Sequence, residues 1–570
     1  MKAPVNVPKL SGFDKSHQNL LTTKCGTITP ILIDELIPGS KVNLKLALSA
    51  SLPPLASDTF MRCSVKVEAF FVPFRLLAGS FESWFTDTEK RYSNFTSSSG
   101  SSMTTVAHKG LLPVIGNLSA ANDATALAAM TATGGLFDYL GFKDAQTDFL
   151  DGTFAVGGIS AMPPLAYHRV YHDWYRNTLV QAEVFLPPTV TQNNVGTSPS
   201  SSGPYLGCSP YLFFNNGTGT NAGPSYLVND SRFLLLADGK YIYDLRQRNF
   251  GLDYFTTATP SPQQGSAEVV SFATSGSTGQ FSIAALRAAN SMQQFKERNN
   301  LAGNLFVEQC FARYGVSPSD GVAQRSLYLG SQEYEVYSKG IYQQGQDIET
   351  SGQLSGTASV GTNNPFQNTT GAQFGSAKAV GTGTLVSGFE AKEPGYLLVN
   401  ATLVPRVTYS SGVHRRWTNY VGPGSLADLA NPILQNVGPQ PIYQYELNGS
   451  GPAALSIFGY TDRYASFKTM EDELHGLVRD GSSLEAFALQ RSFAFSSTPQ
   501  INSSFLEIPT NYMDQVTAVS STLSTYGCWM DCYFDYKVAQ PLAKYSLPSL
   551  QDPGYEHGRT IVLHKGGKRL

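Results

Sequence analysis

Four short runs of this chain alternate apolar with polar side chains, and the first and last runs lie near opposite ends of the sequence. The runs cover residues 42–48, 63–71, 397–403 and 528–536. Because successive side chains of a strand point to opposite faces, this period of two predicts strands with one buried face. The sequence therefore predicts a mainly β framework whose strands are joined by very long connections.

The chain has 570 residues, enough for several domains, but no charge-rich or Pro-rich linker divides it. We expect one large β domain, residues 1–570, that carries insertions. The candidate insertions are residues 93–158, 187–231 and 350–384, and the last two are especially rich in Gly, Ser, Thr and Asn. Such insertions are tolerable because each doubling of loop length adds only about 0.6 kcal/mol of closure free energy. We expect them to protrude from the surface.

The composition favours a protein that meets partners. Charged residues form only 15% of the chain, whereas aromatic residues reach 12%. Protein interfaces show the same depletion of charge and enrichment of aromatic side chains. The net charge is −3, so no global field collects nucleic acid, and any nucleic-acid contact must be local.

The N-terminus shows no export signal. Met1-Lys2-Ala3-Pro4 leads into the chain without the apolar stretch of a signal peptide, and no run approaches the roughly 18 apolar residues of a membrane span. We expect synthesis in a cytosol and no membrane-spanning segment.

The clearest helix is expected after Phe281, with Ser282 as its N-cap and an end near residues 301–303. Its apolar face comprises Ile283, Leu286, Ala289, Met292 and Phe295. We expect this helix to lie on the β framework. Two further helices are expected at residues 122–130 and 162–177.

Six cysteines are too few for a disulfide scaffold of this size, and we interpret them as buried thiols. They are Cys25, Cys63, Cys208, Cys310, Cys528 and Cys532. Cys528 and Cys532 share one face of an expected strand and have no partner pair elsewhere, which favours a structural role over zinc binding.

Two other groups have alternative interpretations. His168 and His172 are spaced to present two nitrogens to one metal, but no third ligand is evident, and we favour hydrogen bonding to neighbours. Residues 471–473, Glu-Asp-Glu, could suggest a glycosidase, but we interpret them as the solvated start of a helix. No recognisable catalytic constellation is present.

Two basic segments could contact nucleic acid. The first, residues 414–420, interleaves cations with aromatic rings, a mixture that grips phosphates and stacks on unpaired bases. The second is the C-terminal tail, residues 558–570. The candidate single-stranded DNA contacts are Arg415, Arg416, Trp417, Lys565, Lys568 and Arg569. Solvated surface or intersubunit ion pairs remain alternatives for both segments.

Motifs distributed along nearly the whole chain follow the order found in one family. They are residues 11–17 (SGFDKSH), 70–76 (FFVPFRL), 161–164 (AMPP), 174–176 (WYR), 253–258 (DYFTTA), 314–317 (YGVS), 432–438 (PILQNVG) and 459–464 (GYTDRY). In this order the chain resembles the major capsid protein of the microviruses, small icosahedral bacteriophages with circular single-stranded DNA. The match is stronger to the gokushovirus-like branch.

The resemblance implies an eight-stranded antiparallel jelly roll with large loop and helical insertions. It implies a virion protein without catalysis or cofactor, which assembles in the bacterial cytoplasm, through pentamers, into a T=1 icosahedral shell. The implied partners are other copies of the chain, the single-stranded DNA genome, a small basic DNA-packaging protein, a pilot protein, an internal scaffolding protein and a host surface receptor. Exposed loops would contact that receptor.

The chain departs from the family in one region. Gokushovirus-like proteins carry a long insertion after the element that matches Pro262-Gln263, whereas here only residues 265–282 precede the expected helix. Additional sequence lies instead at residues 93–158 and 187–231, so the position of a surface protrusion is open.

A β-rich carbohydrate-binding or carbohydrate-active surface protein is the rival interpretation, because long aromatic loops on a jelly roll also bind sugars. Such an enzyme should show a signal peptide and a carboxylate pair in an aromatic cleft. Neither is visible in the sequence, and we favour the capsid protein.

Overall fold

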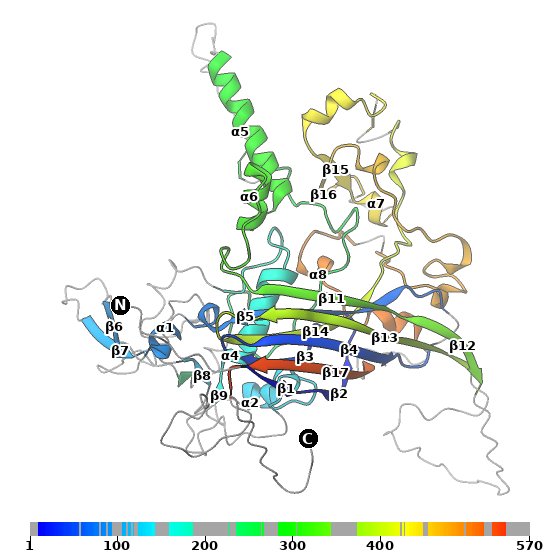
Figure 1. Ribbon diagram of the computed structural model, residues 1–570. Helices are drawn as coiled ribbons and strands as arrows, with labels where there is room; N and C mark the ends of the chain where they lie inside the picture. Colours follow the sequence, from blue (N-terminus) through cyan, green and yellow to red (C-terminus); the bar gives the residue numbers. More distant parts are fainter. Residues whose placement is uncertain are drawn as a thin grey trace, which may run out of the picture.

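The structure, a computed structural model, contains two antiparallel β-sheets that face each other across one core (Figure 1). The described residues are 10–55, 59–78, 81–86, 89–93, 105–109, 112–115, 118, 124–142, 159–185, 227–228, 235–263, 265–266, 283–303, 305–343, 373–421, 425–426, 428–448, 454–494, 497–517 and 527–542. Most residues of the three candidate insertions, 93–158, 187–231 and 350–384, fall outside this set, as does the C-terminal tail.

The first sheet is centred on the C-terminal strand. Strand β17 pairs on one side with β4 and on the other with β1 and β2, and β13 and β12 follow beyond β4. The bounds are β1 (Ser11–Asp14), β2 (His17–Thr23), β17 (Cys528–Gln540), β4 (Lys41–Ser51), β13 (Gln373–Glu390) and β12 (Tyr337–Gln343).

The second sheet has the strand order β11, β5, β14 and β3, and every neighbouring pair is antiparallel. The bounds are β11 (Leu327–Glu335), β5 (Cys63–Pro73), β14 (Gly395–Pro405) and β3 (Thr29–Leu36).

The four alternating runs of the sequence pair with one another. The first and fourth runs lie in β4 and β17, where Leu46 is opposite Phe534. The second and third runs lie in β5 and β14, where Ala69 is opposite Val399. The prediction of four strands is confirmed, and the chain closes its first sheet by joining segments from its two ends.

The core between the sheets consists of the inward side chains of these runs. Leu44, Leu46 and Phe534 of the first sheet and Val67 and Leu397 of the second are all buried in one cluster. The buried apolar area provides the main free energy that holds the sheets together.

The second sheet is buried on its other face as well. Helix α4 (Met162–Val170) and the π-turn η3 (Tyr171–Tyr175) cover that face. Glu68 of β5, expected to face solvent, is buried there and accepts hydrogen bonds from Arg248 at 2.6 Å and from the Tyr175 hydroxyl at 2.6 Å. The prediction that only one face of β5 is buried is therefore wrong. The ion pair with Arg248 allows the Glu68 carboxylate to be buried on the other face.

Residues 373–384 of the candidate insertion 350–384 form part of β13 instead of a protrusion. Alternate positions of this strand carry small residues, including buried Ala377 and Ala379. A Cβ atom on Gly381 would lie 2.5 Å from the Tyr334 ring, so the strand needs a glycine there to fit under β11. This part of β13 alternates small with mostly polar residues. Such a composition is typical of a loop, which is why the sequence indicated an insertion.

Helices α5 (Ile283–Ala302) and α6 (Phe306–Tyr314) form a hairpin that rises away from the sheets (Figure 1). The predicted helix is confirmed, including its end before Gly303, which has a φ of +86°. The expectation that it lies on the β framework is wrong, because most of its apolar side chains are exposed.

A third region, here called the upper lobe (residues 406–421, 428–448 and 454–494), stands beside this hairpin above the second sheet (Figure 1). It contains the elements η5 (Arg415–Trp417), η6 (Pro432–Val437), β15 (Gln440–Tyr443), α7 (Tyr445–Asn448), β16 (Ile457–Thr461), η7 (Ala465–Phe467), η8 (Gly476–Val478) and η9 (Glu485–Phe487). Helix α8 (Ser503–Leu506) and η10 (Tyr512–Val516) connect it back to the core.

The remaining elements surround the end of the sheets where α4 lies. They are η1 (Phe74–Leu76), α1 (Phe81–Phe85), β6 (Glu89–Ser93), β7 (Thr105–Lys109), β8 (Val114–Ile115), α2 (Ala124–Met130), α3 (Leu136–Tyr139), β9 (Ile159–Ser160) and β10 (Leu227–Val228). Helix α2 confirms the helix expected at residues 122–130, and α4 with η3 confirms the one expected at 162–177. Among the described residues, no helix is both long and apolar enough to cross a membrane.

The contrast between the buried and the exposed face of β17 predicts how substitutions on each face change the free energy of unfolding. Phe534 is fully buried, whereas its neighbour Tyr533 is 51% exposed on the other face. Replacing Phe534→Ala should lower the free energy of unfolding by about 3–5 kcal/mol, because it leaves a cavity between the sheets. Tyr533→Ala, the matched control, should change it by about 0.5 kcal/mol. Urea denaturation of unassembled subunits measures both, and equal effects would contradict the inward position of Phe534.

Candidate functional site

A large cleft opens where the upper lobe meets the ends of β5, β11 and β14. It has a volume of about 1110 Å³. Carboxylates from several segments line it, namely Asp253, Glu333, Glu335, Asp462, Glu471 and Asp472. The cations Arg62, Arg406 and Lys468 lie among them. This is the place in the molecule to look for the acid pair of a glycosidase.

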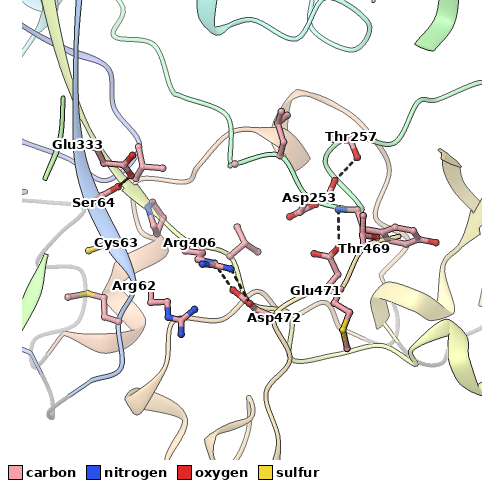
Figure 2. A pocket seen from close by; sticks show the side chains of 18 of the residues that line it. Arg62, Cys63, Ser64, Asp253, Thr257, Glu333, Arg406, Thr469, Glu471 and Asp472 are labelled. Carbon is pink, nitrogen blue, oxygen red and sulfur yellow. Dashed lines mark hydrogen bonds and ion pairs between the residues drawn. The ribbon is translucent and has the colours of Figure 1, made fainter. Parts of the chain in front are cut away.

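The carboxylates of this cleft are engaged in structural contacts (Figure 2). Arg406 Nε lies 2.6 Å from Asp472 Oδ2, and the Ser64 hydroxyl donates to Glu333 at 2.6 Å. Asp253 accepts from the Tyr409 hydroxyl at 2.8 Å and caps the turn that follows it. These contacts fix the loop around Asp253 to the lobe.

Glu471, a carboxyl of this cleft, has a raised pKa. Burial and the nearby charge of Asp253 together raise its pKa to about 6, although the backbone N–H of Tyr254, which donates to it at 3.1 Å, opposes the rise. Glu471 is bonded to a backbone amide and the other carboxylates make structural contacts, so the cleft lacks the pair of free acids that glycoside hydrolysis needs.

A second cleft, of about 480 Å³, holds the predicted basic segment. Arg415 in η5 is only 4% exposed. Its guanidinium donates to the Pro441 carbonyl at 2.8 Å and lies 3.5 Å from the Glu446 carboxylate. Burial raises the pKa of Glu446, although Arg415 opposes that rise. Arg415 therefore serves to hold β15 and α7 against η5 and does not face solvent.

The next two residues do face solvent. Arg416 is exposed and pairs with Glu473, and Trp417 is 74% exposed beside it. The structure thus brings Arg416 and Trp417 together on the rim of the cleft. Lys565, Lys568 and Arg569 lie outside the described residues.

Residues 471–473 were wrongly interpreted as a helix start. They form an irregular extended segment that lines both clefts, with Asp472 paired to Arg406 and Glu473 to Arg416. No local sequence pattern signals this role, because the arginines that neutralise Asp472 and Glu473 lie more than fifty residues earlier.

His168 and His172 do not converge on one point. Buried His168 has Nε2 at 2.9 Å from the Ile242 carbonyl, and its Nδ1 accepts from Arg246 Nε at 3.0 Å. His172 lies 3.0 Å from Asp173 and 2.8 Å from Glu183. Burial lowers the pKa of His168 well below its usual range, so it stays neutral. Within the described ranges, no three His, Cys, Asp or Glu side chains are placed to hold a metal ion.

Four cysteines are buried as expected, namely Cys25, Cys63, Cys528 and Cys532. Burial raises the pKa of both Cys528 and Cys532 to about 12, so these thiols are unreactive. Cys310 in α6 is only partly buried, which departs from the expectation. Cys208 lies outside the described residues.

The shifted pKa of Glu471 makes a pH prediction. Its folded-state pKa, about 6, lies above the ordinary 4.5, so the folded chain binds the proton more tightly. The free energy of unfolding therefore falls as pH rises through this interval. Glu471→Gln keeps the acceptor for Tyr254 and should raise the melting temperature by roughly 1 °C at pH 7.5, with no gain at pH 4.5.

Differential scanning fluorimetry at the two pH values measures this difference. Glu485→Gln, which removes an exposed carboxylate from a nearby position in the chain, is the control and should show no pH-dependent gain. A gain for Glu471→Gln that is the same at both pH values would contradict the assignment.

A family model and two individual relatives both identify the family of this chain. The family model described as capsid protein (F protein) of phages matches residues 4–550. Capsid protein VP1 of Chlamydia phage 1 is 24% identical over 96% of this chain and 97% of its own length. Capsid protein VP1 of Bdellovibrio phage phiMH2K is 25% identical over 95% of each chain. The chain belongs to the phage capsid protein (F protein) family, and it is a structural protein of the virion, not an enzyme.

Proposed function

We propose that this major capsid protein is an eight-stranded jelly roll whose copies close a small T=1 icosahedral shell around a circular single-stranded DNA genome. The coarser part of this statement, a mainly antiparallel β capsid subunit, rests on the family and on the sheets described above.

The strand order carries the proposal. Eight strands numbered along the chain as β2, β3, β4, β5, β11, β13, β14 and β17 fall into two sheets. The first sheet contains them in the order one, eight, three, six, and the second in the order two, seven, four, five. A jelly roll produces this order, because a long antiparallel hairpin wraps so that its two arms alternate between the sheets.

A shell subunit must meet neighbours on several sides, and specific contacts bury roughly 800 Å² on each partner. The low content of charge suits such surfaces. We propose copies of this chain as its main partner, with pentamers as assembly intermediates. A small basic DNA-packaging protein, a pilot protein, an internal scaffolding protein and a host surface receptor complete the proposed partners.

For the genome we propose local contacts. Exposed Arg416 and Trp417 combine a cation with a stacking surface, which suits unpaired bases, and the tail adds Lys565, Lys568 and Arg569. Since the chain carries a net charge of −3, most of the neutralisation of the phosphates must come from the basic packaging partner.

Electron microscopy of native particles, with nuclease protection of the same fraction, tests the proposal. Uniform small icosahedral particles that protect single-stranded DNA, and whose density map shows the strand order above, are the expected result. Monomers without nucleic acid, in the presence of the other phage proteins, would overturn it and revive the carbohydrate-binding alternative.

The tail makes a quantitative prediction for DNA binding by purified subunits. Replacing Lys565, Lys568 and Arg569 together by Gln should lower the dependence of log affinity on log salt by about 2, since each phosphate contact on a single strand contributes about 0.7. Titration of a labelled oligonucleotide between low and moderate salt measures the slope. Lys240→Gln with Lys392→Gln removes two exposed charges elsewhere and should leave the slope unchanged. An unchanged slope in the tail variant would remove the tail from the DNA contacts.

A further inference from the structure

The α5–α6 hairpin exposes more apolar surface than any free-standing element should. Eight of its large hydrophobic side chains, all in the described part of the chain, have exposed fractions between 43% and 77%. They include Leu286 and Met292 of α5 and Phe306, Phe311 and Tyr314 of α6. Helix α6 has no buried residue at all. Exposed apolar patches of this kind mark sites of association.

Polar contacts, not apolar packing, hold the hairpin to the body of its own chain. Asn300, the buried residue of α5, donates to the Ser261 carbonyl at 2.8 Å. Lys296 Nζ donates to the Ser266 carbonyl at 2.8 Å. The usual arrangement of a surface helix is therefore reversed, since polar side chains face the protein and apolar side chains face outward.

The two helices are also fixed to each other. Gln309 donates to the Asn299 carbonyl at 3.1 Å, and the Arg313 guanidinium lies 4.8 Å from the centre of the Phe295 ring. Helix α5 has 20 residues and so extends about 30 Å, far enough to reach beyond its own subunit. The hairpin is thus a preformed arm, which loses little conformational entropy when it docks.

Charge indicates what the arm docks against. Residues 283–314 carry four basic side chains, Arg287, Lys296, Arg298 and Arg313, against two acidic ones. Residues 471–485 of the upper lobe carry the opposite balance, five acidic side chains against one basic. Asp472 and Glu473 pair with arginines of the same lobe, whereas Asp480 and Glu485 are exposed. That second segment also exposes Leu477 and Leu484 beside Asp480 and Glu485. The chain therefore displays two separate surfaces that are complementary in both charge and apolar character.

We propose that the α5–α6 hairpin is an assembly arm that docks on residues 471–487 of a second copy of this chain. The proposal rests on the self-assembling shell proposed above. Because the two surfaces differ, the contact is head-to-tail, and a head-to-tail contact repeats around a symmetry axis until the ring closes. The arm thereby links each subunit to the next one around the shell.

Matched substitutions test the arm in particles that the cell assembles with the other phage proteins. Leu286→Gln with Met292→Gln keeps good helix formers at exposed positions and should lower the yield of particles at least tenfold, while the soluble subunits keep the wild-type melting temperature. The control, Leu20→Gln with Leu455→Gln, likewise replaces two apolar side chains by Gln, at positions that are more exposed and lie outside both the hairpin and residues 471–487. It should assemble as the wild type does. Equal yields for the two variants would overturn the proposal.

Cys310 identifies what covers the arm. It lies in α6 and is partly accessible in the single chain, whereas the other described cysteines are buried. Maleimide labelling of Cys310, read from its own peptide by mass spectrometry, should be at least fivefold slower in particles than in dissociated subunits. A photo-crosslinker placed on Cys310 before assembly should give a product of twice the 61.6 kDa chain, joined at residues 471–487.

Crosslinks to another virion protein, to a different part of a second copy, or equal labelling rates would overturn the proposal. Absence of particles from the wild-type chain would instead refute the proposed shell. The two failures are therefore distinguishable in one set of samples.

Discussion

The pairing of β17 with β4 is the contact on which the rest of the structure depends. It joins the last described strand of the chain to one of the first, from Trp529 opposite Ser51 to Ala539 opposite Lys41. Everything between them is connection, including three of the four strands of the second sheet, the hairpin and the upper lobe. Pairing at this sequence distance is slow, because the closure of so long a loop must precede the contacts that stabilise it. The first sheet is therefore completed only after the whole chain is available.

The inner faces of both sheets could be predicted because a period of two survives in the sequence wherever one face meets the core. Phe534 and Leu46 were placed correctly from that period alone. The buried outer face of the second sheet could not be predicted from the sequence. Burial of Glu68 depends on Arg248, which lies 180 residues away. Strand β13 was also missed in part, because Gly381 was selected for the space under Tyr334, and glycine in sequence indicates a loop.

The candidate site likewise contains features that could be predicted from the sequence and features that could not. Residues 414–417 of the predicted basic segment line a cleft, but the roles of adjacent residues differ according to their burial. Arg415 is enclosed by Glu446 and the Pro441 carbonyl, whereas Arg416 and Trp417 face solvent. In a turn as short as η5, neighbouring side chains point to different sides, and too few residues are present for a period that would show which of them face solvent. Nor could the acids of residues 471–473 be assigned to their arginines before the fold was known.

A capsid subunit differs from a solitary globular protein in where its apolar side chains lie. In α5 the apolar face inferred from the sequence is real, but its side chains remain uncovered in the single chain, and Asn300 faces the body instead. An amphipathic pattern therefore specifies that a face will be covered, but not whether the covering surface belongs to the same chain. Where polar residues make the intramolecular contacts, as in this hairpin, the apolar face remains available to a neighbour. This reversed arrangement, with polar side chains toward the body and apolar side chains outward, distinguishes a helix that can contact a neighbouring subunit from one that packs into the core of its own chain.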